Sequence, residues 1–154
     1  MEMILGIVGA ITGLFALAIS FFSYRHTRIE AVNDFFNRFL DPESIKARRI
    51  IRTLGDYNIA DLNEQQETAF SSIITEYSKA GLFVKKKQLP FWVFDMAVGY
   101  KVMNFYEKLK PYINERRKNE PGYAFHFEYL YDRLKKAKHP AWKDSNDNNK
   151  YEDS

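Results

Sequence analysis

The chain of 154 residues contains no cysteine, only five prolines and seven glycines, and three histidines. The lack of cysteine excludes a disulfide framework and is typical of a protein kept in a reducing compartment. His26, His126 and His139 share no metal-ligand spacing, so we expect no metal site. A Gly-x-Ser-x-Gly elbow, a Walker loop and a dinucleotide-binding fingerprint are also missing from the sequence. We therefore predict no catalytic residues, no cofactor and no enzymatic activity.

Charged residues are absent from residues 3–24, and basic side chains follow at Arg25 and Arg28. A helix over this run is about 33 Å long at about 1.5 Å per residue, enough to cross a hydrocarbon core of about 30 Å. The alternative is a cleaved signal peptide, because Ala16-Leu17-Ala18 offers a small-x-small cleavage pattern, but the basic stretch that opens such a peptide is missing. We predict a transmembrane helix over 3–24 in a single-pass inner-membrane protein, with the N-terminus outside and the C-terminal domain cytoplasmic.

Small residues line one face of this predicted span. Their spacings alternate between three and four, as do the a and d positions of a heptad, at Gly6, Gly9, Gly13, Ala16, Ser20 and Ser23. Small side chains let the backbones of neighbouring helices approach closely, and Gly9-x-x-x-Gly13 is the minimal form of such a contact. The alternative is that Gly, Ala and Ser are simply common in membrane helices. We predict a homo-oligomer in the lipid bilayer, with an interface at Gly6, Gly9, Gly13, Ala16 and Ser20.

Helical periodicity continues after the predicted span, and no stretch resembles a ladder of strands. Residues 25–40 contain no glycine or proline, which favours one continuous rod over residues 3–40. Further helices are expected over 42–54 after the N-cap Asp41, from Asn63 to Gly81, from Pro90 until Pro111 kinks or ends it, and after Gly122. We predict an all-α protein with a cytoplasmic helical domain over 25–138 and a disordered tail over 139–154.

Positive charge is concentrated in the predicted helical domain. Residues 25–142 carry 21 basic and 15 acidic side chains, a net charge of +6 that attracts lipid headgroups, nucleic acids or phosphorylated small molecules. The candidate ligand-binding cations form two clusters, one of Lys46, Arg48, Arg49 and Arg52 and one of Lys85, Lys86 and Lys87. The second cluster directly precedes the expected helix start at Pro90, where free backbone N–H groups favour an anion. Both clusters could instead be solvated faces.

Trp92 lies close to the second cluster in the sequence, together with Phe83 and Phe91. These aromatic rings could stack on nucleotide bases, or they could be core residues of a small helical domain. We include Trp92 with the candidate ligand-binding residues.

Three short motifs resemble small single-span bacterial proteins that are grouped under a domain of unknown function. The motifs are Phe36-x-x-x-Leu40, Ala47-Arg48-Arg49 and Phe127-Glu128-Tyr129-Leu130. The layout of one predicted span, a small-residue face and a basic helical domain also resembles the membrane-anchored ancillary effectors of type III CRISPR antiphage defence. This resemblance implies an oligomer that binds a cyclic oligoadenylate, typically cyclic tetra-adenylate, and then disturbs the membrane.

The function expected from these features is that of a membrane-anchored antiviral effector. An anionic nucleotide messenger would bind the basic clusters, and the oligomeric helices would perturb the membrane. The alternative is a constitutive membrane-anchored adaptor that binds a protein partner or anionic lipid, with an enzyme acting on lipid headgroups as a third possibility. Duplex nucleic acid is not an expected partner.

Overall fold

The computed structural model describes the backbone of residues 2–94 and 97–137 and the side chains of residues 12–94 and 98–137. All regular elements in this part of the chain are helical, which confirms the all-α prediction. They are α1 (Glu2–Leu40), α2 (Pro42–Thr53), the 3-10 turn η1 (Ile59–Asp61), α3 (Glu64–Lys85), the 3-10 turn η2 (Phe91–Phe94), α4 (Ala97–Arg117) and α5 (Phe125–Lys136).

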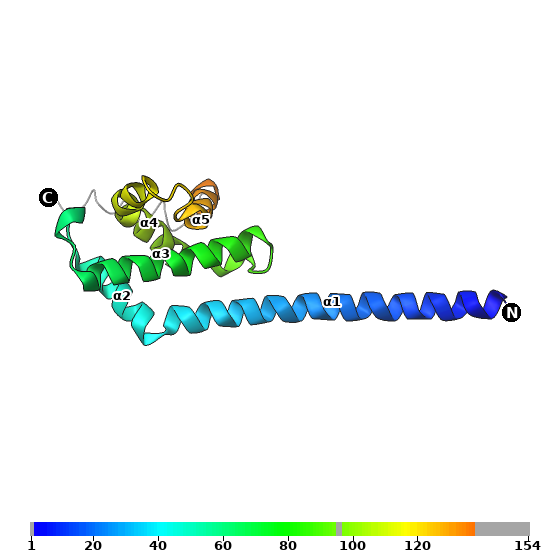
Figure 1. The fold of residues 1–154 in the computed structure, drawn as a ribbon. Coiled ribbons are helices and arrows are strands. Elements are labelled where there is room, and N and C mark those ends of the chain that lie inside the picture. The colour runs from blue at the N-terminus through cyan, green and yellow to red at the C-terminus, as the bar shows by residue number, and fades with distance from the viewer. Residues whose placement is uncertain (1, 95–96, 138–154) are drawn as a thin grey trace.

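Helix α1 is one continuous rod, as the sequence predicts. Its C-terminal half lies beside α3, and its N-terminal half projects away from the body formed by α2 to α5 (Figure 1). Phe35 anchors the rod, because its buried ring contacts Phe39 within α1 and Phe94 of η2, with centroids 5.9 Å and 5.1 Å away. The rod and the body are therefore held together near the C-terminal end of α1.

The prediction of a transmembrane helix over 3–24 is contradicted. Across the described residues, no helix combines the length and the apolar character needed to cross a membrane. The single-pass inner-membrane placement rested on that span and is corrected with it.

Two helix starts follow the capping patterns in the sequence. The Asp41 carboxylate accepts hydrogen bonds from the backbone N–H groups of Glu43 and Ser44, at 3.0 Å and 3.2 Å, and so begins α2. Asn63 and Gln66 form a capping box in which each side chain accepts the other residue's backbone N–H at 2.9 Å. Both starts lie at the predicted residues because a cap needs only local contacts.

Helix α3 lies at the centre of the body and packs against α2, α5 and α1. Its buried Tyr77 ring lies 5.2 Å from Phe127 of α5, which in turn lies 5.1 Å from Tyr106 of α4. Aromatic pairs of this kind add about 0.5–1.5 kcal/mol each beyond the burial of their surface. A continuous aromatic core therefore joins α3, α4 and α5 into one unit.

Helix α3 does not end at Gly81 as predicted but continues to Lys85. A Cβ atom at position 81 would lie 2.0 Å from the backbone oxygen of His126, so glycine permits α5 to approach α3 closely. Gly81 therefore permits close packing of α3 against α5 and does not terminate α3.

The predicted helix over 90–111 is also placed differently. Pro90 precedes the short turn η2, and α4 begins at Ala97. Pro111 lies inside α4, which continues to Arg117 because the next two side chains, Tyr112 and Ile113, are buried in the core. The last predicted helix is confirmed as α5, and the predicted tail over 139–154 lies outside the described residues.

Candidate functional site

Arg48, a predicted ligand-binding residue, is buried in the corner between α1, α2 and α3. Its guanidinium group contacts the Glu76 carboxylate at 3.0 Å, and each side chain is only 7% exposed. Arg48 also donates to the backbone oxygen of Phe39 and lies 4.2 Å from the centroid of that ring. The hydrogen-bonding groups of Arg48 are thus directed at other parts of the fold. The expectation that Arg48 faces a ligand is wrong, because burial and pairing make it a structural residue.

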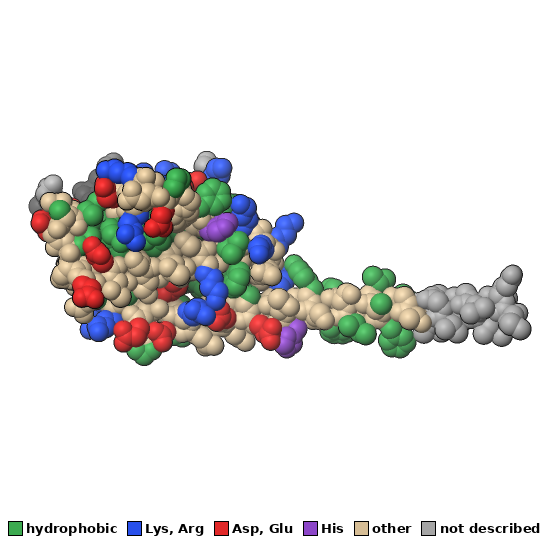
Figure 2. Space-filling model, in the orientation of Figure 1, with side chains coloured by type: hydrophobic (Ala, Val, Ile, Leu, Met, Phe, Trp, Pro, Cys, Tyr) green, Lys and Arg blue, Asp and Glu red, His purple; other side chains and the backbone are tan. Residues whose placement is uncertain are grey.

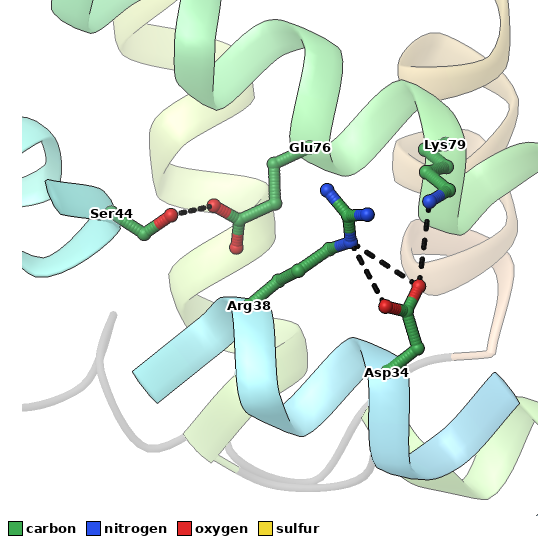
Figure 3. Close-up of polar contacts among 5 residues, drawn as sticks. All are labelled: Asp34, Arg38, Ser44, Glu76 and Lys79. Carbon is green, nitrogen blue, oxygen red and sulfur yellow. Dashed lines mark hydrogen bonds and ion pairs between the residues drawn. The ribbon is translucent and has the colours of Figure 1, made fainter. Parts of the chain in front are cut away.

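Glu76 is the acceptor at the centre of this corner. Ser44 donates from its hydroxyl group to Glu76 at 2.9 Å (Figure 3). Burial raises the pKa of Glu76, and this effect outweighs the opposing effects of Ser44 and Arg48. Burial therefore destabilises the ionised carboxylate of Glu76, and the contacts with Ser44 and Arg48 offset part of this cost.

A polar groove of about 940 Å³ opens next to this corner, between α1, α2, α3 and the end of α4. At its wall Asp34 pairs with Arg38 at 3.2 Å and with Lys79 at 3.4 Å (Figure 3). Burial raises the pKa of Asp34, but the two cations outweigh it and the net shift is downward. The charged residues that line the groove are five acids and three bases, namely Asp34, Asp41, Glu64, Glu67, Glu76, Arg38, Lys79 and Arg116. An excess of acids does not favour an anionic ligand here.

The other cations of the first predicted cluster are exposed but do not share one site. Lys46 lines a separate groove of about 430 Å³ together with two acids, Glu43 and Glu64. Arg52 lines a small groove of about 190 Å³ together with Lys101 and the mostly buried Arg48. Arg49 lines none of the grooves described here. The cluster seen in the sequence is divided among different faces of α2.

The second predicted cluster lies in the turn after α3. The Lys85 ammonium group lies 4.9 Å from the centroid of Phe125, which directs this side chain toward α5. Lys87 has a left-handed backbone, with φ of 60°, and its N–H donates to Val84 at 3.0 Å. This turn reverses the chain, so that Lys86 and Lys87 remain exposed while Leu89 enters the core.

The same turn leads into η2 and places Trp92 beside α1. Val93 and Phe94 are buried, and the Phe94 ring packs edge-on against Phe35 of α1. Trp92 is 60% exposed, because it lies on the outer side of this short turn. The possibility that Trp92 belongs to the core is thereby excluded.

Trp92 lines a groove of about 280 Å³ between η2 and α1, which we call the junction groove. Its lining residues are Arg25, Arg28, Ile29, Val32, Asn33, Pro90 and Trp92. The Nε atom of Arg28 is buried and has no hydrogen-bond partner within the described part of the chain. Lysine and arginine side chains gather where the projecting part of α1 meets the body (Figure 2). The junction groove combines an exposed indole with two guanidinium groups.

Sequence reasoning proposed Trp92 as a ligand residue but did not assign Arg25 or Arg28 to the same site. Trp92 follows the two arginines by more than sixty positions, and only the reversal after α3 brings it beside them. The signal in the sequence is two arginines one helical turn apart next to an uncharged run, a pattern that also flanks membrane spans.

Comparison with known proteins places this fold in a family without an assigned activity. No curated protein and no solved structure matches the chain. The resemblance to CRISPR effectors therefore gains no support, whereas the resemblance to proteins of unknown function is confirmed. The family match covers residues 3–134, which includes α1 and the whole described body through most of α5. The chain belongs to the family described as domain of unknown function DUF4760.

Proposed function

We propose that this protein binds an anionic ligand that carries a planar ring, of the nucleotide class, in the junction groove. The observation that carries this proposal is the position of the exposed Trp92 beside Arg25 and Arg28 in one groove.

The two arginines supply the anion-binding part of the site. A guanidinium group presents several N–H donors in a fixed plane, which suits the oxygens of a phosphate group. Neither Arg25 nor Arg28 forms an ion pair among the described residues.

Trp92 supplies the ring-binding part of the site. An indole that is 60% exposed offers a flat apolar surface to a base. Stacking of one base on an aromatic side chain is worth about 1–3 kcal/mol and tolerates different bases. Because Val93 and Phe94 are buried in the core, the backbone of η2 holds Trp92 at the edge of the groove.

The size of the groove limits the ligand. A volume of about 280 Å³ lies at the small end of ligand pockets, which span about 300–1,000 Å³. We therefore expect one nucleotide unit to occupy the groove. A cyclic oligoadenylate, the ligand implied by the resemblance to CRISPR effectors, would enter with one of its units.

Tryptophan fluorescence offers a direct test. The chain contains two tryptophans, so Trp142→Phe leaves Trp92 as the single reporter in the full-length protein. Titration with adenosine monophosphate and cyclic tetra-adenylate is expected to quench Trp92 emission, and adenosine without phosphate to bind at least about tenfold more weakly. Arg28→Gln is expected to lower the affinity about tenfold to a hundredfold, since a hydrogen bond to a charged group is worth about 1.5–3 kcal/mol.

A matched control separates this site from general attraction to positive charge. Lys46→Gln with Arg49→Gln removes two positive charges from exposed positions on α2, outside the junction groove. We expect less than about a twofold change in affinity, because exposed charges far from the ligand are screened by salt. Equal losses in this control and in the Arg25→Gln, Arg28→Gln variant would contradict a defined site, as would the absence of quenching by every nucleotide.

The sequence-based alternative is an adaptor that binds a protein partner through its aromatic residues. It predicts that Trp92→Ala abolishes partner binding and that nucleotides have no effect on Trp92 emission. The same titration therefore separates the two functions.

A further inference from the structure

We propose that a second groove, between the end of α1, α2 and α4, binds a small amphiphilic anion, that is, a carboxylate or phosphate group carried on a short apolar chain. This groove of about 190 Å³ is called the α2–α4 groove below. Its lining residues are Phe39, Leu40, Ile45, Arg48, Arg52, Lys101 and Phe105, none of which lines the junction groove. The second site is therefore independent of the nucleotide site proposed above.

The charged residues that line the α2–α4 groove are all basic. They are Arg48, Arg52 and Lys101, and no described acid lines the groove with them. The Glu76 carboxylate, which pairs with Arg48, lines the polar groove beside α3 and not this one. Like charges gathered on one concave surface add up to a positive potential that attracts an anion. The α2–α4 groove thus differs in sign from the polar groove, where acids are in excess.

Two of the three cations have donors to offer to a ligand. Arg52 and Lys101 are exposed, and neither forms an ion pair with another described residue. Arg48 already donates to Glu76 and to the backbone oxygen of Phe39, so it adds positive charge at the groove without being the main donor. A guanidinium group and an ammonium group that converge on one point suit the oxygens of a carboxylate or phosphate group.

The two helices that carry these donors are joined at one end of the groove. The Lys108 ammonium group of α4 donates to the backbone oxygen of Arg52 at 3.3 Å, and also to that of Leu54. Lys101 lies two helical turns before Lys108 and therefore on the same side of α4. The contact places Lys101 opposite the side of α2 that carries Arg48 and Arg52. The spacing between the two walls is therefore set by the fold.

Apolar side chains next to the cations define the rest of the ligand. Leu40 is 65% exposed and Ile45 is 40% exposed, and both line the groove with the rings of Phe39 and Phe105. A simple inorganic ion would leave these side chains in water, whereas an apolar chain attached to the anion covers them. The volume is below the roughly 300–1,000 Å³ of ordinary ligand pockets, which favours a short chain and not a nucleotide.

NMR titration of the full-length chain with hexanoate and with hexyl phosphate tests the proposal. Affinity is measured from the backbone amide signals of residues 39–52, which remain observable in every variant. We expect both anions to shift these signals, and hexanol, which lacks the charge, to bind at least about tenfold more weakly. Acetate is also expected to bind at least about tenfold more weakly than hexanoate, because burial of each methylene group raises the affinity up to about fourfold.

Substitutions at exposed positions separate the site from general attraction to positive charge. Arg52→Gln with Lys101→Gln should lower the hexanoate affinity at least about tenfold. Arg49→Gln with Lys110→Gln is the matched control, since it also removes one arginine from α2 and one lysine from α4, at exposed positions outside the groove. We expect less than about a twofold change in this control. Thermal unfolding verifies that both variants fold, and Lys101→Gln alone is the milder variant if the first one does not.

Four outcomes would overturn the proposal. Equal losses in the test and control variants would indicate non-specific attraction, and equal binding of hexanol and hexanoate would indicate an apolar patch without an anion site. An absence of shifts with both anions would mean that the groove binds neither. Loss of hexanoate binding in the Arg25→Gln, Arg28→Gln variant, with retention in Arg52→Gln, Lys101→Gln, would place the anion in the junction groove instead. Trp92 emission with nucleotides is measured separately, so failure of one site does not decide the other.

Discussion

The guanidinium group of Arg48 and the carboxylate of Glu76 form an ion pair at 3.0 Å, and each of the two side chains is 7% exposed. The pair joins α2 to α3, and through the Arg48 contact with Phe39 it also holds the end of α1. Three helices therefore depend on one arginine that the sequence presents as part of a basic cluster.

Arg48→Ala is expected to destabilise the protein by about 3–5 kcal/mol, because it leaves the Glu76 carboxylate buried without its cation. Arg49→Ala, at an exposed neighbouring position, is the matched control and should change stability by less than about 0.5 kcal/mol. Chemical denaturation followed by helical circular dichroism measures both. Replacing both members of the pair, Arg48→Met with Glu76→Leu, should recover much of the lost stability. If it does not, the packing of the arginine side chain, and not its charge, is what stabilises α2.

Gly81→Ala is expected to destabilise the body by about 1–3 kcal/mol, because the new Cβ atom would lie 2.0 Å from the His126 backbone oxygen and push α5 away from α3. Gly55→Ala is the matched control. A Cβ atom there meets nothing within 4 Å, and Gly55 does not have a positive φ. Thermal unfolding distinguishes the two substitutions, and a loss in Gly55→Ala equal to that in Gly81→Ala would contradict the close approach of the two helices.

The ion pair between Arg117 and Glu128, at 2.8 Å, makes stability depend on pH. The hydrogen bond from Arg117 lowers the pKa of Glu128 below its ordinary value of 4.5. A carboxyl group whose pKa is lowered by folding stabilises the protein above the unfolded pKa, and this contribution is lost as the pH falls through the folded pKa. Glu128→Gln should therefore lower the thermal midpoint at pH 7 and make little difference near pH 3. A difference that stays constant over this range would show that the ion pair is not the cause.

The location of the helices was accessible from local sequence patterns. Asp41 and Asn63 begin their helices where expected, because capping hydrogen bonds involve residues only two or three positions apart. The continuous rod of α1 and the buried side of α5 also follow from spacing alone, since a helix presents every third or fourth residue to the same neighbour.

The tertiary structure alone decided what the individual residues do. Gly81 looked like a helix end but is a point of close helix contact, because the His126 backbone that it approaches is distant in the sequence. Arg48 and Arg49 are neighbours in one basic cluster, yet one is buried against Glu76 and the other is exposed. Trp92 meets Arg25 and Arg28 only because the chain reverses after α3. Periodicity in the sequence predicts which side of a helix is buried. A binding site depends on which distant elements come into contact, and packing of the tertiary structure determines that.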